Sequence, residues 1–173
     1  MNIQPCYIGI TGHRHFSEPE MYKFVSDTLR DKLSTLKAEH GNVRALSALA
    51  LGADTIFAEI ALGLGYELEV VVPFARFQDD FKNEDDVKQY KSLLERALAV
   101  HRLRFVNKSD FAYLSAGKWI VNRSDVLIAV WDGLPGKGAG GTSDIVAYAK
   151  KMGTVCWHIH TDEQIVKEVN ANG

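Results

Sequence analysis

The sequence predicts a single α/β domain with a Rossmann-like, doubly wound sheet that is mainly parallel and has helices on both faces. Three observations lead to this prediction. Short apolar segments alternate with segments of helical periodicity along almost the whole chain, as in successive βαβ units. Several apolar segments are continuous runs, which is typical of strands covered on both faces. The length of 173 residues suits one domain, residues 1–173, with a substantial core.

Six segments are expected to form strands, because each is a short apolar run bounded by glycine, proline or polar residues. The first is closed by Gly12, and the valine-rich run that ends at Pro73 suits a strand buried on both faces. The expected strands are residues 6–11, 43–49, 68–73, 103–106, 125–130 and 155–159.

Helices are expected between these strands, where apolar residues recur at helical spacing. The first is predicted by Ser17 as a hydroxyl cap and Pro19 in the first turn, and it stops before Gly41. The acidic residues 79–86 are expected to form a surface loop, and the C-terminal tail a short polar helix. The other expected helices are residues 51 to 63 or 65, 87–100, 113–123 and 143–152.

Composition narrows the classes of partner. The formal net charge of -2 and the pI of about 6.3 show no excess of positive charge, so we expect neither polymeric nucleic acid nor a membrane as partner. A single nucleotide stays open, because backbone N–H groups bind small anions. Cys6 and Cys156 lie in apolar strands and are expected to be buried free thiols, and no Cys/His cluster indicates a metal or cofactor site. Residues 1–7 lack the features of a signal peptide and no apolar stretch is long enough to span a bilayer, so we expect a cytoplasmic protein.

The residues directly after each strand are the candidates for binding, because ligands of open α/β sheets lie beyond the carboxyl ends of the strands. After the first strand, Gly12 permits close backbone approach, His13 can donate or accept near neutral pH, and Arg14 offers a planar fork of donors to phosphate. Arg14 could instead pair with a loop acid, but its position after a buried strand favours ligand contact. After the second strand, Gly52 and Asp54 open a helix whose N–H groups attract anions, although Asp54 suits simple capping equally well.

Three further candidates have weaker support. Arg76 follows the third strand and is open as a phosphate ligand, whereas its neighbour Phe77 is expected to cover the edge of the core. Tyr113 and Lys118 stand near the start of a later helix and are expected near the mouth of the site.

The strongest local signal is the loop of residues 131–141, which contains five glycines and a proline and leads straight into a helix. Gly138, Gly140 and Gly141 remove side chains where a chain must pass a ligand closely, and Thr142 is expected to cap the helix. Together they predict an anion cradle. No Lys-Ser/Thr pair follows the glycines, so the loop is not a Walker A motif.

Four motifs, taken together and in their order along the chain, resemble the SLOG superfamily. Relatives in that superfamily include the LOG nucleotide phosphoribohydrolases, the DprA/Smf Rossmann domain and sensor domains of bacterial conflict systems. The resemblance implies a Rossmann-like fold and a site for nucleotides or nucleotide-derived signals, with the phosphate on the late Gly-Gly-Thr loop. It carries over Gly12, Arg14, Gly140, Gly141 and Thr142 as binding residues. The motifs are residues 9–14 (GITGHR), 47–54 (SALALGAD), 124–133 (SDVLIAVWDG) and 138–144 (GAGGTSD).

Two acids flank the glycine loop, and they decide between binding and catalysis. If the chain is an enzyme, Asp144 or Asp132 would serve an N-glycosidase, a phosphoribohydrolase or a deoxyribosyltransferase-like reaction. The family's hydrolases resemble this chain in having an acid after Gly-Thr, but theirs is the glutamate of a Pro-Gly-Gly-x-Gly-Thr-x-x-Glu run. Here the proline is missing, the spacing is shorter and the acid is Asp144. We therefore expect a nucleotide-binding sensor, with the enzyme as the alternative. A sensor of this size needs another protein or self-association to report its state, and the resemblance implies a homo-oligomer because relatives commonly oligomerise.

Overall fold

The fold is built on a central seven-stranded sheet, seen in a computed structural model that describes residues 4–136 and 138–169. The strands are β1 (Cys6–Gly12), β2 (Val43–Ser47), β3 (Glu67–Val72), β4 (Ala99–Arg102), β5 (Val126–Trp131), β6 (Val155–His160) and β7 (Ile165–Val169). Their order across the sheet is β4-β3-β2-β1-β5-β6-β7, and every pairing is parallel except that of β6 with β7. The predicted Rossmann-like, mainly parallel α/β fold is confirmed.

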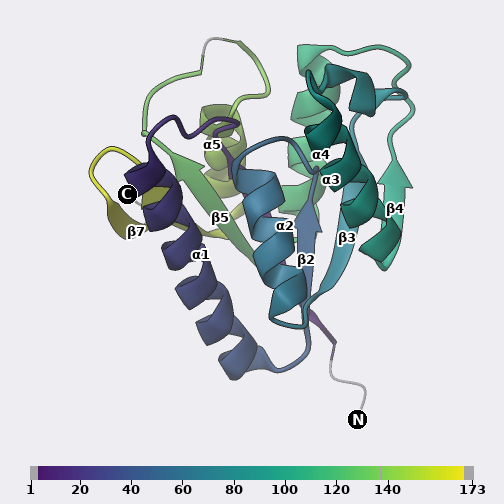
Figure 1. Cartoon of the computed structure of the whole chain (residues 1–173). Coiled ribbons are helices and arrows are strands. Elements are labelled where there is room, and N and C mark those ends of the chain that lie inside the picture. The colour runs from purple at the N-terminus through teal and green to yellow at the C-terminus, as the bar shows by residue number, and fades with distance from the viewer. Residues whose placement is uncertain (1–3, 137, 170–173) are drawn as a thin grey trace.

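Helices cover both faces of this sheet. They are α1 (Pro19–His40), α2 (Ala53–Gly63), α3 (Glu84–Arg96), α4 (Asp110–Arg123) and α5 (Thr142–Met152), with a 3-10 turn η1 (Phe77–Asp80). Figure 1 shows α1, α2 and α3 on the face toward the viewer and α4 and α5 behind the sheet. In β5, Val126, Ile128 and Val130 join the core under α1 to α3, whereas Leu127 and Ala129 join the core under α4 and α5. The run of apolar residues in this strand is therefore explained by burial on both faces.

The acidic stretch expected to be a loop instead contains the start of α3. Asn83 caps this helix, because its Oδ1 accepts the N–H of Asp86 at 2.8 Å. The acids that suggested a solvated loop occupy the first helical turn, where negative charge is stabilised by the helix dipole.

The expected strand at residues 103–106 was wrong by four residues. The N–H of Leu98 donates to the carbonyl of Leu68 at 2.7 Å and aligns the following residues with β3. A cross-strand contact of 2.9 Å between His101 Nε2 and Glu69 Oε2 supports the same register. The position of β4 is thus set by pairing with β3 and not by an apolar pattern of its own.

The C-terminal tail is a strand, so the expected short polar helix was wrong. β7 runs antiparallel to β6, with Cys156 opposite Val169 and His160 opposite Ile165. Gln164 takes a positive φ of 50° in the turn between them. Most residues of β7 are exposed. An exposed edge strand carries polar residues, and in the sequence this polarity resembles that of a surface helix.

Two expected helix caps also lie elsewhere. The N-cap of α1 is Glu18 instead of Ser17, and the helix starts on Pro19 without a side-chain cap. The N-cap of α5 is Gly141, so Thr142 is the first helical residue instead of the cap.

The two cysteines are free thiols. Cys156 is buried, and burial raises the pKa of its thiol to about 11. Cys6 is only half-buried, so the expectation of burial is confirmed for one of the two. Within the described residues, no helix combines the length and apolar character needed to cross a membrane.

Candidate functional site

The chain reverses direction across the sheet between β1 and β5. It builds β1 to β4 toward one edge and then returns to place β5, β6 and β7 on the other side of β1. Such a switch point leaves a crevice at the carboxyl ends of the two strands. A cavity of about 370 Å³ lies there, which we call the loop cavity. It is bounded by residues 10–14, by α4, by Asp54 and by residues 131–132, 134–136 and 140–143, and its volume suits a small molecule.

Two glycines let the turn after β1 pack against the start of α2. The N–H of His13 donates to the carbonyl of Val130, and its carbonyl accepts the N–H of Ala53, both at 2.9 Å. A Cβ on Gly12 would lie 2.6 Å from the Cβ of Ala53, and one on Gly52 would lie 2.4 Å from the carbonyl oxygen of His13. Both glycines are therefore required by close packing of the protein on itself.

Asp54 is a buried carboxyl group that lines the loop cavity. It stands in the first turn of α2 with 6% of its surface exposed, and its Oδ2 accepts the N–H of Ala50 at 3.3 Å. Burial raises the pKa of Asp54 to about 7, against the opposing effects of the Ala50 N–H and the positive charge of Arg14. The cavity therefore contains one acid that changes protonation near neutral pH.

Asp132 braces the loop that follows β5. Its Oδ1 accepts the N–H of Leu134 at 2.9 Å, which closes a turn at the start of the loop. Its Oδ2 lies 3.4 Å from Nε2 of His13, and its N–H donates to the same nitrogen at 3.2 Å. Asp132 and His13 thus join the two turns at the switch point.

The glycine-rich part of the loop is held over the start of α5. The N–H of Gly140 donates to Asp144 Oδ2 at 2.8 Å, and the N–H of Gly136 donates to Ser143 Oγ at 3.0 Å. The first N–H groups of a helix have no partner within the helix, so the start of α5 presents donors at the cavity, where Thr142 lines the wall. Asp144 serves this arrangement by fixing the loop.

Arg14 is held by an acid and an aromatic ring. Its Nη1 lies 3.1 Å from Asp80 Oδ2, and its guanidinium carbon lies 4.6 Å from the centre of the Tyr113 ring. The Tyr113 hydroxyl donates to the same oxygen at 2.5 Å, and Lys108 binds the other carboxylate oxygen. Hydrogen bonds from Lys108, Tyr113 and Arg14 lower the pKa of Asp80 even though burial opposes them, so Asp80 is ionised at neutral pH.

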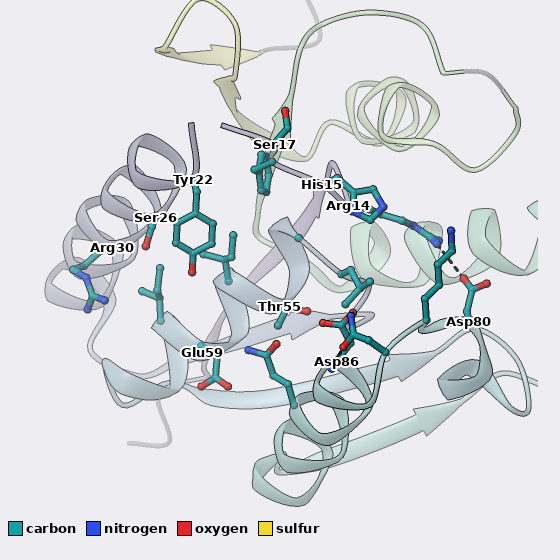
Figure 2. Close-up of a pocket in the computed structure, with 18 of the residues that line it drawn as sticks. Arg14, His15, Ser17, Tyr22, Ser26, Arg30, Thr55, Glu59, Asp80 and Asp86 are labelled. Carbon is teal, nitrogen blue, oxygen red and sulfur yellow. Dashed lines mark hydrogen bonds and ion pairs between the residues drawn. The ribbon is translucent and has the colours of Figure 1, made fainter. Parts of the chain in front are cut away.

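A second, larger hollow of about 950 Å³ lies between α1, α2 and α3. Figure 2 shows this groove, with Tyr22 and Arg30 on α1, Glu59 on α2, and Arg14 and Asp80 at one end. Arg14 lines both hollows, so it lies at the boundary between the groove and the loop cavity.

The structure brings most of the predicted site residues together and separates the rest. The loop cavity is lined by Gly12, His13, Arg14, Asp54, Asp132, Gly140, Gly141 and Thr142. Gly52 lines the groove instead. Arg76 is 84% exposed, pairs with Asp79 at 2.6 Å and lines neither hollow. Gly138 lies beside Asp110, because a Cβ there would be 3.2 Å from Asp110 Oδ2.

The side chains near the mouth show what the sequence could and could not locate. Tyr113 lines the cavity as expected, whereas Lys118 lies over the ring of Tyr148 at 5.0 Å and does not line it. Phe77 is 2% exposed, which confirms that it covers the core. The alternative that Arg14 pairs with a loop acid is what the structure shows, with Asp80 as the acid. Lys108, which also pairs with Asp80, was missed because it carries no motif. Among the described residues, no group of three or more His, Cys, Asp or Glu is placed to hold a metal ion.

Comparison with solved structures identifies the fold. The DNA processing protein A (DprA) of Helicobacter pylori matches with a TM-score of 0.63 at 20% identity, over 89% of this chain and 65% of that one. DprA of Streptococcus pneumoniae matches with a TM-score of 0.61 at 16% identity, over 89% and 50%. The molybdenum cofactor binding protein of Rippkaea orientalis matches with a TM-score of 0.56 at 18% identity, over 90% and 76%.

These likenesses show that the domain shares the Rossmann-like fold of DprA and of the molybdenum cofactor binding protein. The identities are low, so the fold is what they establish. The chain spans about half to two thirds of the two DprA chains. No protein-family model matches the sequence, and no curated protein matches it.

The comparison also corrects one expectation drawn from composition. The sequence led us to expect no polymeric nucleic acid as partner, yet the structure of H. pylori DprA is described as one with a single-stranded DNA binding mode. The expectation of no polymeric nucleic acid is therefore withdrawn for a domain of this fold.

Proposed function

We propose that this chain binds a nucleotide or a nucleotide-derived small molecule in the loop cavity and acts as a sensor of that molecule. The observation that carries the proposal is the composition of the cavity wall. The wall combines apolar side chains, Ile10, Ala116 and Ile120, with the glycine loop at the start of α5. An apolar wall suits a base, and N–H groups at a helix N-terminus suit a phosphate.

The acids named from the sequence support binding more than catalysis. Asp144 accepts the N–H of Gly140, and Asp132 accepts the N–H of Leu134, so both carboxylates hold the loop in shape. A nucleotide whose phosphate meets the loop would find a preformed site, which reduces the cost of ordering on binding.

The test is a ligand panel read by thermal unfolding and calorimetry. The panel contains nucleoside monophosphates, NAD, cyclic dinucleotides, inorganic phosphate and a short single-stranded DNA, since a protein of the same fold binds single-stranded DNA. A true ligand at a hundred times its Kd should stabilise the protein by about 2.7 kcal/mol. If no nucleotide raises the unfolding temperature, the proposal is wrong.

Gly141→Ala gives a matched pair with Gly63→Ala. A Cβ on Gly141 would have no neighbour closer than 3.8 Å, and one on Gly63 would have none within 4 Å, so the protein accommodates either methyl group. Only Gly141 lines the loop cavity. We expect Gly141→Ala to weaken nucleotide binding at least tenfold, about 1.4 kcal/mol, and Gly63→Ala to leave it unchanged.

One observation favours a second candidate, cleavage of an N-glycosidic bond. Asp54 lines the cavity as a buried acid with a pKa of about 7, and such a group can donate a proton to a departing base. Incubation with each nucleoside monophosphate, followed by chromatography for free base, distinguishes the enzyme from the sensor. Release of base that disappears in Asp54→Asn would replace the sensor by an enzyme.

A further inference from the structure

Three donors from three segments of the chain converge on the carboxylate of Asp80. Arg14 follows β1, Lys108 lies in the connection from β4 to α4, and Tyr113 is on α4. Arg14 Nη1 and the Tyr113 hydroxyl reach Oδ2 at 3.1 and 2.5 Å, and Lys108 Nζ reaches Oδ1. Asp80 itself belongs to η1, a fourth segment of the chain. The three donors therefore come from outside the segment that carries the acid.

The charges of this cluster do not cancel. Arg14 and Lys108 both direct their positive charge at Asp80, which carries one negative charge. The Asp80 side chain is only 14% exposed, whereas Arg14 and Lys108 are 40% and 58% exposed, so both cations are open to an anion from solution. Burial and the nearby Asp80 raise the pKa of Tyr113 to about 12, so its hydroxyl stays a donor at neutral pH. Two cations and a hydroxyl donor are better satisfied by a group with two charges and three oxygens, which describes a phosphate.

The cluster lies where a ligand in the loop cavity would extend. Arg14 and Tyr113 line the loop cavity, whereas Arg14, Asp80 and Lys108 line the groove. Figure 2 shows Arg14 and Asp80 pointing toward one another at the end of the groove. Asp80 thus lines the groove, and its Oδ2 bonds to two side chains that line the loop cavity.

We propose that Arg14, Lys108 and Tyr113 form an anion subsite, that Asp80 occupies it in this structure, and that a phosphate of the ligand takes the place of the Asp80 carboxylate. The inference rests on the proposed function for the identity of the ligand, and it adds that the ligand carries a phosphate beyond the one at the glycine loop. Asp80 is the last residue of η1, a single turn anchored in the core by Phe77. Release of the three donors by the Asp80 side chain therefore leaves the Phe77 anchor of η1 in place under the proposal.

The test compares Asp80→Asn with Asp79→Asn in the full chain. Both variants remove one negative charge from η1, but Asp79 pairs with Arg76 and does not touch Arg14. Inorganic phosphate is the probe, titrated while the side-chain N–H signals of Arg14 are followed by NMR. We expect Asp80→Asn to bind phosphate at least tenfold more tightly than the unmodified protein, and Asp79→Asn to differ from it by less than threefold.

A second substitution separates competition from a structural role. If Asp80 merely orients Arg14, Asp80→Asn binds phosphate no better than Asp79→Asn or binds it less well, and the proposal is overturned. If the gain arises at the proposed subsite, adding Lys108→Met to Asp80→Asn abolishes it. Should Asp80→Asn fail to fold, the unmodified protein is titrated with pyrophosphate. A shift of the Arg14 signals that Lys108→Met weakens supports the subsite, and no shift of those signals refutes it.

The result of this test does not depend on whether the loop cavity binds a nucleotide. Phosphate binding that is gained in Asp80→Asn and survives addition of Gly141→Ala supports the subsite even if no nucleotide binds. Nucleotide binding that Gly141→Ala weakens, without any gain of phosphate binding in Asp80→Asn, supports the loop cavity and refutes the subsite alone.

Discussion

Replacement of Asp54 by asparagine should stabilise the protein at neutral and alkaline pH. The folded state raises the pKa of this carboxyl from 3.8 to about 7, because burial disfavours its charged form. A raised pKa means that the folded protein holds the proton more tightly than the unfolded chain does. The stability linked to this proton is fully present below pH 3.8 and is lost as pH rises to about 7. An asparagine side chain has no proton to lose in this range, and its amide oxygen can still accept the Ala50 N–H.

The size of the effect follows from the difference in pKa. At about 1.4 kcal/mol for each pH unit, the shift from 3.8 to about 7 corresponds to a ceiling of about 4 kcal/mol. About 3 kcal/mol of this ceiling falls between pH 5 and pH 8, because ionisation of the unfolded chain is almost complete at pH 5.

Urea unfolding at pH 5, 6, 7 and 8 measures this loss directly. The unmodified protein should lose up to about 3 kcal/mol over this range, and Asp54→Asn should lose little at this site. Asp27→Asn is the control, because Asp27 is an exposed residue of α1 whose carboxylate pairs with Lys23. The reasoning fails if the unmodified protein is equally stable at pH 5 and pH 8, or if Asp54→Asn and Asp27→Asn respond to pH alike.

Two further predictions concern the loop and the thiols. Gly140→Ala should destabilise the protein by about 1–3 kcal/mol in urea unfolding, because its φ is 85° and a Cβ would lie 2.8 Å from the carbonyl oxygen of Asp110. Gly141→Ala should be nearly neutral in the same assay, and equal effects of the two would contradict this account of the loop. Cys6 should react with a thiol reagent at pH 8 before Cys156, whose reaction should require unfolding, and simultaneous labelling in the native state would show that Cys156 is accessible.

The sequence predicted the central part of the fold and was less successful at its edges. The strands from β1 to β3, β5 and β6 carry apolar runs that are buried on both faces, so their local pattern is strong. β4 and β7 are the edge strands of the sheet, and neither contains a buried residue. Their register comes from pairing with a neighbour, and that information lies far away in the sequence.

The residues that line the loop cavity were predictable where they follow strands. Gly12, Arg14 and Gly140 come together there because the carboxyl ends of parallel strands meet at one edge of the sheet, and their role in binding stays a prediction. Arg76 also follows a strand, but it occupies a left-handed conformation with φ of 52° and its side chain pairs with Asp79. A position directly after a strand therefore predicts a residue of the loop cavity only where the turn that follows the strand packs against a neighbouring turn.

Two glycines at the switch point are explained by packing of the protein on itself. Gly12 and Gly52 are required because two turns pack within reach of each other's backbone, which is a demand of the switch point itself. Those turns bring backbone donors and Arg14 to one place whatever the ligand is. The side chains around these turns differ in kind from the backbone donors: Asp54 lines the loop cavity, and Asp80 lines the groove beside it. Under the proposed function, the acids at positions 54 and 80 are the residues whose substitution should change what is bound.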